Sequence, residues 1–379
     1  MEVRFFKKSE RQLLLDSIDR LWRHDHIYVR NPAVLEHLVL NTPYRAEFAG
    51  EDNYSFVGMW DDDGKVIGLQ GIIPQRFNVF GEECCSSTGT VWYVDKTSRS
   101  KLNKPIDGLK MSEFAYSSKR KLFHRGGPSA GCSFGLSEIS YQISEAYGAY
   151  MTRDLPRWIG IVDKDSVMKY LLPESTPPII LPEVHPIDYN EALKVRVDEF
   201  EQTGWDAFYH KVVAPKTIGT QRDYRFLKWR YIDSPVLKYR FVTVHNDADK
   251  YVGLAIFRRE PIFGGKFSLG RIVEFICFQA EASIVLASAM LKTYPDVIAW
   301  DFYCLSGITA FGLEAVGFRR IPIWMDQVMM PTRFQPVDYE HMKINGQVSL
   351  SDNIRRKVEQ MTEIPWYITR GDSDQDRAN

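Results

Sequence analysis

The order of helix and strand patterns repeats along this chain, and this repeat constrains the fold more than any other feature of the sequence. Each half contains a strand hairpin, a buried strand, a helix, another strand and a helix that ends at a glycine. Gly68 in VIGL and Gly253 in YVGL mark the two hairpins, and Gly148 in ISEAYGA and Gly317 in GLEAVGF end the two last helices. The sequence therefore predicts one structural unit that is used twice.

The two copies differ in their first elements and in their length. The first copy opens with a strand at residues 3–6 and a helix, whereas YNEALKVRVDEFEQ, residues 189–202, is predicted as a helix that opens the second copy. Extra residues of the first copy fall around 96–108 and 119–127. Helices often end at a glycine, so the endings alone would not establish a repeat. The shared order of elements favours duplication.

The length of the chain predicts two domains. A chain of 379 residues can form two hydrophobic cores. Five prolines between residues 173 and 186 predict an extended, semi-stiff linker. We therefore expect an N-terminal domain at 1–165, a Pro-rich linker at 166–186, a C-terminal domain at 187–335 and a C-terminal extension at 336–379.

The composition excludes several classes of protein. A formal net charge of -1 argues against a dedicated nucleic-acid binder. No apolar run is long enough to cross a membrane, and the N-terminus, MEVRFFKKSERQ, lacks the apolar segment of a signal peptide. The five cysteines have no CxxC spacing and the eight histidines are scattered. We therefore expect reduced thiols, no metal site and a cytoplasmic location.

A strongly basic stretch follows the predicted strand TVWYV at residues 90–94. Residues 96–125 contain nine Lys and Arg against two acidic residues, in a chain that is nearly neutral. This suits a ligand with several phosphates, although a solvated, salt-bridged surface would have the same composition. The matching stretch of the second half, IVEFICFQAEAS, is apolar and acidic. We therefore expect the phosphate-bearing ligand in the first copy.

The element order and the GLEAVGF ending resemble those of the GNAT acyltransferases. Three stretches, residues 94–105, 223–235 and 366–379, are similar in particular to double-GNAT acyltransferases of bacterial surface-polysaccharide (O-antigen or capsule) synthesis. The resemblance implies an α/β (α+β) fold of two tandem GNAT-like domains, each with a mixed, mainly antiparallel sheet flanked by helices. It also implies transfer of an acyl group from acyl-coenzyme A (acyl-CoA) to an amine of a nucleotide-linked sugar.

The same resemblance implies where acyl-CoA would bind. In the GNAT fold an open strand edge holds pantetheine by backbone hydrogen bonds, and a loop and helix N-terminus hold the pyrophosphate. The usual glycines of that loop are missing from this sequence, but its positive charge is retained. The residues implied in cofactor binding are Val91, Trp92, Tyr93, Val94, Arg99, Lys101 and Lys104.

The acid and base of such a reaction do not carry over directly. Many GNAT enzymes have a tyrosine four residues before the glycine that ends the helix, but here Ser144 and Leu313 occupy that position. Tyr141 is the tyrosine suggested instead. Glu138 and Asp301, expected at the ends of the equivalent fifth strands, are the candidate bases. Water could also accept the proton, since an amino-sugar amine is less basic than lysine.

The implied acceptor, an amino-dideoxy sugar linked to a nucleotide such as dTDP, needs aromatic stacking and cations for its diphosphate. The segment RDYRFLKWRYIDSP and the C-terminal tail could supply both. The structural alternatives are an amphipathic helix that packs into the core and a disordered polar tail. The residues implied in acceptor binding are Arg222, Trp229, Arg230, Tyr231, Asp374 and Arg377.

Three other functions fit the same pattern. A FemAB-like aminoacyltransferase is also a double GNAT, but it would call for a more basic surface. A non-catalytic GNAT pair acting as a scaffold would explain the missing glycines and tyrosine. A GNAT enzyme could also acylate a protein or a small amine. The acyl group, acetyl or a short hydroxyacyl such as 3-hydroxybutanoyl, stays open, as does assembly into a homo-oligomer.

Overall fold

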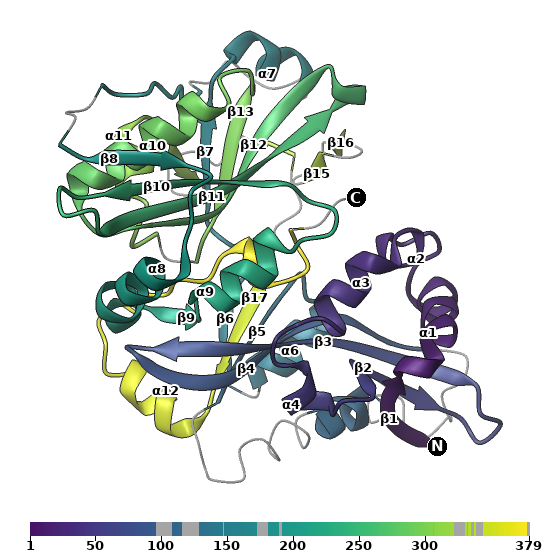
Figure 1. Ribbon diagram of the computed structural model, residues 1–379. Helices are drawn as coiled ribbons and strands as arrows, with labels where there is room; N and C mark the ends of the chain where they lie inside the picture. Colours follow the sequence, from purple (N-terminus) through teal and green to yellow (C-terminus); the bar gives the residue numbers. More distant parts are fainter. Residues whose placement is uncertain are drawn as a thin grey trace.

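The protein consists of two lobes, each built on a mixed β-sheet with helices against it (Figure 1). These lobes are seen in a computed structural model. It describes residues 1–95, 108–115, 129–146, 148–172, 181–188, 192–305, 307–321, 330–331, 333–334, 337–338 and 344–376.

The sheet of the first lobe combines strands from three parts of the chain. Its pairs are antiparallel except for β4 with β5, which are parallel. In spatial order the strands are β1 (Glu2–Lys7), β2 (Asn53–Trp60), β3 (Val66–Val79), β4 (Glu82–Val94), β5 (Ala130–Phe134), β17 (Gly346–Leu350) and β6 (Tyr150–Thr152), and β9 (Ile218–Thr220) pairs with β3.

The sheet of the second lobe has the same plan. One pair, β12 with β13, is parallel, and the others are antiparallel. In spatial order the strands are β8 (Lys194–Val197), β10 (Tyr239–His245), β11 (Tyr251–Ile262), β12 (Phe267–Cys277), β13 (Ala299–Tyr303), β7 (Arg157–Ile161) and β14 (Arg319–Ile321).

Helices and short helical turns flank both sheets. In the first lobe these are η1 (Lys8–Glu10), α1 (Arg11–Ser17), η2 (Ile18–Trp22), α2 (Ile27–Arg30), α3 (Pro32–Val39), α4 (Arg45–Ala49), helical residues 108–115, α6 (Glu138–Ala146) and α12 (Asp352–Val358). The rest of the chain contributes α7 (Lys164–Tyr170), α8 (Gln202–Phe208), η3 (Tyr209–Val213), η4 (Ala214–Lys216), α9 (Tyr224–Leu227), η5 (Lys228–Ile232), η6 (Phe263–Gly265), α10 (Ala280–Thr293), α11 (Phe311–Ala315) and η7 (Arg370–Asp372), with a small hairpin of β15 (Arg333–Phe334) and β16 (Val337–Asp338).

The register of the sheets confirms the predicted repeat. Gly68 lies opposite Val94 in the first sheet, and Gly253 lies opposite Cys277 in the second. Gly148 and Gly317 both have positive φ, at 73° and 113°, the left-handed conformation that glycine adopts after a helix. The predicted helix at 189–202 is wrong, however. KVRV forms β8 instead, at the edge of the second sheet, where it pairs with β10. Its charged and apolar residues alternate, which is the pattern of a strand.

The two lobes exchange strands, which the predicted boundaries at 165 and 335 do not allow for. Strand β7 precedes residue 165 but lies in the second sheet, between β13 and β14. Strand β17, from the predicted extension, takes the equivalent place in the first sheet, between β5 and β6. Each sheet is thus completed by a strand from the other half of the chain. The predicted linker at 166–186 is also partly helical, since α7 extends into it, and residues 173–180 lie outside the described residues.

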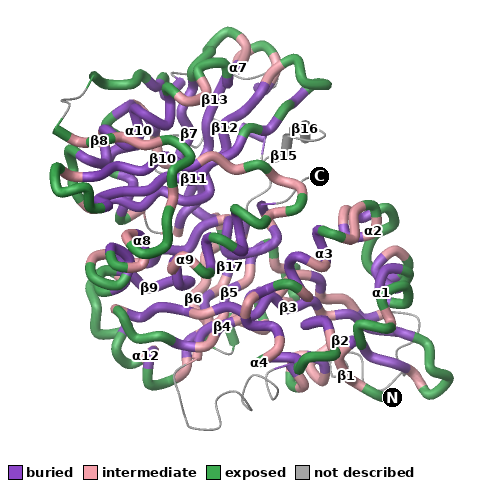
Figure 2. Tube along the Cα trace, in the orientation of Figure 1, coloured by how far each residue is buried: buried purple, intermediate pink, exposed green. Residues whose placement is uncertain are grey.

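A shared core joins the lobes into one unit. The largest cluster of buried apolar side chains includes Phe56 and Leu69 from the first sheet together with Phe226 and Leu254 from the second half. The central strands of the second sheet are buried almost throughout (Figure 2). None of the described helices has the length and hydrophobicity needed to cross a membrane.

Candidate active site

Strands β4 and β5 part from one another and leave a wedge in the first sheet. Their parallel contact consists of a bridge between Cys85 and Ser129 and the pair Thr88 and Cys132. Just beyond, the backbone N–H of Gly89 donates to the Ser133 hydroxyl at 3.3 Å. From there β4 continues to Val94, paired with β3 alone. Within the described ranges, no strand pairs with its other edge.

A β-bulge interrupts β4 where the wedge opens. Gln70 of β3 lies opposite Trp92, and Ile72 lies opposite Gly89, so β4 carries one residue more than β3 over this interval. The extra residue falls at Thr90 and Val91. A bulge of this kind bends the strand and redirects its side chains and backbone groups. It therefore places polar backbone groups of β4 at the base of the wedge.

The second lobe contains the same bulge and wedge, but there the edge is closed. Val273 is the extra residue of β12, which parts from β13 after Ile272. The N–H of Phe275 donates to the Tyr367 hydroxyl at 2.9 Å, and its carbonyl accepts from Thr309 Oγ1 at 2.5 Å. These side chains occupy the hydrogen-bonding groups that an extended ligand would need.

The predicted pantetheine edge lies along the open side of β4. Side chains of Val91 and Tyr93 pack toward the main core, and those of Trp92 and Val94 pack on the opposite face with helical residues 108–115. The backbone between these two faces forms the edge that has no strand partner among the described residues. Contact of these four residues with acyl-CoA stays a prediction. Three further residues of the prediction, Arg99, Lys101 and Lys104, lie outside the described residues.

The C-terminal tail crosses the base of the wedge. Asp374 Oδ2 accepts hydrogen bonds from Thr90 Oγ1 at 2.7 Å and from the Tyr28 hydroxyl at 3.1 Å. On the β5 side, a side-chain carbon at Gly135 would lie 3.2 Å from Nε2 of Gln375. The tail is therefore folded up to residue 376, and Arg377 lies outside the described residues.

The residues expected to bind the acceptor's diphosphate hold this tail instead. Arg222 donates to Glu274 at 3.0 Å and to Asp372 at 2.8 Å. Arg230 donates to the carbonyls of Gly371 and Ser373 at 2.7 and 2.6 Å. Both arginines are buried, at 1% and 5% exposure. The structure thus differs from the expectation, since neither guanidinium lies in solvent where a diphosphate could reach it.

The two aromatic residues of this segment are also interior. Trp229 donates to the carbonyl of His37 at 3.0 Å and its ring stacks on the His37 imidazole, while the Tyr231 hydroxyl donates to Glu274 at 2.6 Å. Burial raises the pKa of Glu274 above its ordinary value, although Arg222 acts in the opposite direction. The segment therefore packs its apolar face into the core, as its alternative interpretation stated, but Arg222 and Arg230 are buried while Arg225 is exposed.

The three candidate catalytic residues are not brought together. Asp301 lies in the middle of β13, where Arg271 and Arg157 donate to it at 2.9 and 2.8 Å. Burial would raise the pKa of Asp301, but the two arginines outweigh it and hold that pKa below its ordinary value. Tyr141 is buried at 3% exposure.

Glu138 and Asp301 are not structurally equivalent, which corrects the expectation from the sequence. Glu138 begins α6, beyond the end of β5, and is exposed. The register pairs Asp301 with Arg271 and, in the first lobe, Cys132 with Thr88. Cys132 therefore occupies the place of Asp301 in the first sheet. The loop between β5 and α6 is shorter than the loop between β13 and α11. The sequence alone therefore does not show which residues of the two loops correspond.

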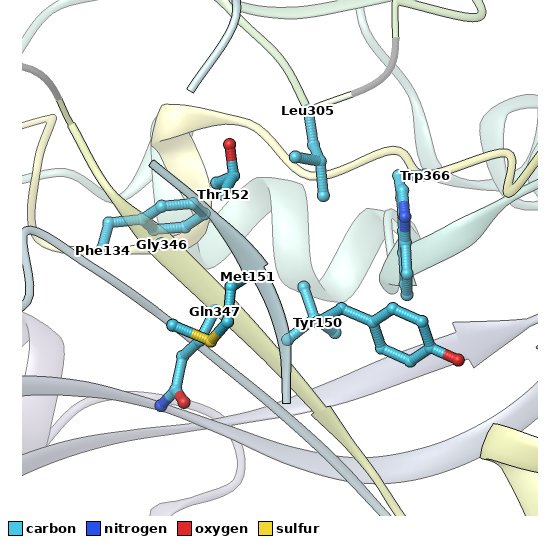
Figure 3. A pocket seen from close by; sticks show the side chains of 9 residues that line it. Phe134, Tyr150, Met151, Thr152, Leu305, Gly346, Gln347 and Trp366 are labelled. Atoms are coloured by element: carbon cyan, nitrogen blue, oxygen red, sulfur yellow. The ribbon is translucent and has the colours of Figure 1, made fainter. Parts of the chain in front are cut away.

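A small cavity lies beside the end of β5 (Figure 3). Its volume is about 140 Å³. It is lined by Phe134 of β5, by β6 and β17, and by Leu305 and Trp366, so its walls are mainly apolar. Trp366 belongs to the same tail that crosses the wedge.

Known structures share this fold, whereas no protein-family model and no curated protein matched the chain. A GCN5-related N-acetyltransferase from Anabaena variabilis has a TM-score of 0.52 over 92% of this chain and 72% of its own, at 10% identity. The chain has a double GNAT fold. Saccharomyces cerevisiae N-myristoyltransferase, solved with bound myristoyl-CoA, has a TM-score of 0.50 over 92% of this chain and 77% of its own, also at 10% identity.

A third neighbour is longer than this double-GNAT chain. It is a protein of unknown function from Enterococcus faecalis, described as a probable N-acyltransferase, with a TM-score of 0.50 and 13% identity. The match covers 79% of this chain but 64% of that protein, less than two thirds of its length. Likeness at this level of identity establishes the fold, and activity must be argued from the site itself.

Two hydroxyl residues of the GNAT wedge were not found from the sequence. Tyr28 and Thr90 meet Asp374 only because α2, β4 and the tail converge, and nothing in their neighbouring residues marks them. The one available signal is the tail itself, where Asp372, Asp374 and Asp376 stand at every second position. In the structure this stretch forms η7 followed by turns, so the three carboxylates reach different partners.

Proposed function

We propose that this protein is an acyl-CoA-dependent N-acyltransferase whose donor binds along the open edge of β4 in the first lobe. The main support for this proposal is that the two wedges differ in whether their strand edge is hydrogen-bonded. The edge of β4 beyond Thr88 has no strand partner among the described residues, whereas the matching group on β12, at Phe275, is bonded to Tyr367 and Thr309. An extended pantetheine can pair with an open edge as an added strand does.

The chemistry follows from that placement. Pantetheine along β4 would bring the thioester to the bulge at Thr90 and Val91, where the strand changes direction. The acceptor amine then attacks the thioester carbonyl, the C–N bond forms, the C–S bond breaks and CoA leaves as a thiolate. Holding the two reactants together accounts for much of the rate enhancement in such a reaction. The basic stretch at 96–125 would balance the phosphates of CoA.

The acceptor we propose is the amino group of a nucleotide-linked amino-dideoxy sugar, with dTDP as the expected nucleotide. Resemblance of residues 94–105, 223–235 and 366–379 to double-GNAT enzymes of surface-polysaccharide synthesis supports this choice. The transferred group would be acetyl or a short hydroxyacyl such as 3-hydroxybutanoyl. Since Arg222 and Arg230 bind the tail, the acceptor's diphosphate would have to be held by other residues.

Thiol release tests the proposal. The purified protein is mixed with acetyl-CoA or 3-hydroxybutanoyl-CoA and a panel of nucleotide-linked amino sugars, simple amines and peptides, and free CoA is followed with a thiol reagent. We expect release that requires both the donor and one amino sugar. Release with a peptide or a simple amine alone would keep the transferase and replace the acceptor. CoA binding without release under any condition would indicate a non-catalytic GNAT pair.

A further inference from the structure

Residues of the tail form the floor of the wedge between β4 and β5. Asp374 is bonded to Thr90 on the β4 side, and Gln375 lies against Gly135 on the β5 side. Two arginines fix the backbone of the tail. Arg230 donates to the carbonyls of Gly371 and Ser373, and Arg370 Nε donates to the carbonyl of Gln375. A thioester at the bulge of β4 would therefore meet the tail directly.

Two aspartates of the tail form ion pairs with buried arginines. Asp372 is ion-paired with Arg222, and Asp376 is ion-paired with Arg258 at 2.8 Å and accepts from the Tyr239 hydroxyl at 2.6 Å. These two carboxylates fasten the tail to the rest of the protein. Asp374 is held by the hydroxyls of Tyr28 and Thr90. It is also the one that lies at the bulge.

We propose that Asp374 is the catalytic base of the acyl transfer, an inference that rests on the proposed function. In this step the amine nitrogen bonds to the thioester carbon, and the proton that the nitrogen loses passes to the Asp374 carboxylate. The C–S bond breaks, CoA leaves as a thiolate, and a proton from solvent completes the thiol. The proton on Asp374 then returns to solvent. Thr90 and Tyr28 orient the carboxylate through their hydroxyls.

Several charged and titratable groups surround this carboxylate. The Tyr28 hydroxyl belongs to α2, and the His26 ring packs edge-on against the Tyr28 ring at 4.6 Å. Arg230 of η5 binds the chain on both sides of Asp374, at Ser373 and Asp376. Asp372 and Asp376 flank it in the tail, each with its own arginine. The test must therefore compare variants that leave these groups unchanged.

Asp374→Asn is the informative variant. An asparagine carbonyl can accept the same two hydrogen bonds from Thr90 and Tyr28, so the fold and CoA affinity should be retained. The amide cannot take up a proton, and loss of a general base lowers kcat by about 100-fold or more. The activity that remains should no longer fall on the acid side of the pH–rate profile. Lys228→Met, which removes a half-exposed ion pair with Asp233, is the control and should keep both kcat and the pH profile.

Thr90→Val provides a second test that does not depend on Asp374→Asn folding well. It removes one of the two hydrogen bonds by which hydroxyls orient the carboxylate. The kcat should therefore fall while the affinity for CoA is retained. The proposal is overturned if Asp374→Asn keeps the wild-type kcat and pH profile, or if Thr90→Val keeps the wild-type kcat. Wild-type protein that releases no thiol with any donor and acceptor overturns the proposed function and this inference together.

Discussion

Replacing Arg222 by methionine should destabilise the whole molecule. Methionine keeps an unbranched apolar stem but removes the guanidinium that donates to Glu274, Asp372 and the carbonyl of Thr220. Glu274 and Asp372 are both completely buried, at 0% exposure. Removing one partner of a buried ion pair leaves uncompensated charge and costs about 3–5 kcal/mol. Since this arginine contacts two carboxylates, we expect the upper part of that range.

The loss should depend on pH in a definite direction. Burial already raises the pKa of Glu274, and Arg222 opposes that rise. Without Arg222 the native pKa of Glu274 moves further above its value in the unfolded chain. A native pKa above the unfolded one gives stability that is present at low pH and lost as the pH rises through the native pKa. The deficit of Arg222→Met relative to the wild type should therefore be larger at neutral pH than at about pH 5.

Thermal unfolding measures this effect, with Lys228→Met as the matched control. Lys228 lies further along the same segment, at the start of η5, and forms a half-exposed ion pair with Asp233, for which a loss of about 0–1 kcal/mol is expected. Arg222→Met should lower Tm by roughly 5–6 °C. Adding Glu274→Gln should restore part of the loss, because it removes one of the unpaired charges. A Tm for Arg222→Met equal to that of the control would refute the reasoning.

Three further predictions use other parts of the structure. Burial, reinforced by Arg230, lowers the pKa of His37 to about 4. Since the native pKa lies below the unfolded one, the stability of the wild type is lost as the pH falls from about 6.5. His37→Phe keeps the stack on Trp229 and lacks this titration. Between pH 7 and pH 5 it should therefore gain about 2 kcal/mol relative to the wild type, as measured by urea unfolding at the two pH values. In Gly219→Ala the added methyl group would clash with the Tyr367 carbonyl, so the free energy of unfolding should fall by about 1–3 kcal/mol. Proteolysis of the tail should also become faster, and an unchanged Tm and cleavage rate would contradict this prediction. Isothermal titration should find one CoA site per chain, and two equal sites would show that the second wedge is open.

Sequence patterns were sufficient for the order of the elements. The hairpins at Gly68 and Gly253 follow from alternating apolar residues around turn residues, which depend on near neighbours. The same holds for the helix ends at Gly148 and Gly317, where only glycine adopts the required φ without strain. The helix predicted at 189–202 failed because KVRV within it alternates, and pairing with β10 decided its conformation.

The candidate site could not be predicted in the same way. Arg222 and Arg230 look like ligand-binding cations in the sequence, and their true partners, Asp372 and Gly371, lie about 140 to 150 residues further along the chain. Asp374 was selected from the tail, but its contact with Thr90 of β4 depends on packing between the lobes. Periodicity indicates that a face is buried and leaves open what covers it.

By itself, the sequence determined a doubled α/β unit, its glycine-capped helices and a basic stretch confined to the first copy. These features depend on interactions within a few residues or on local composition. Only the tertiary structure decided that β7 and β17 are exchanged between the sheets, that the second wedge is closed by Tyr367 and Thr309, and that the tail forms the floor of the first wedge. Each of these depends on hydrogen bonds between backbone or buried polar groups far apart in the chain, which must be satisfied once water is excluded and which leave no local pattern.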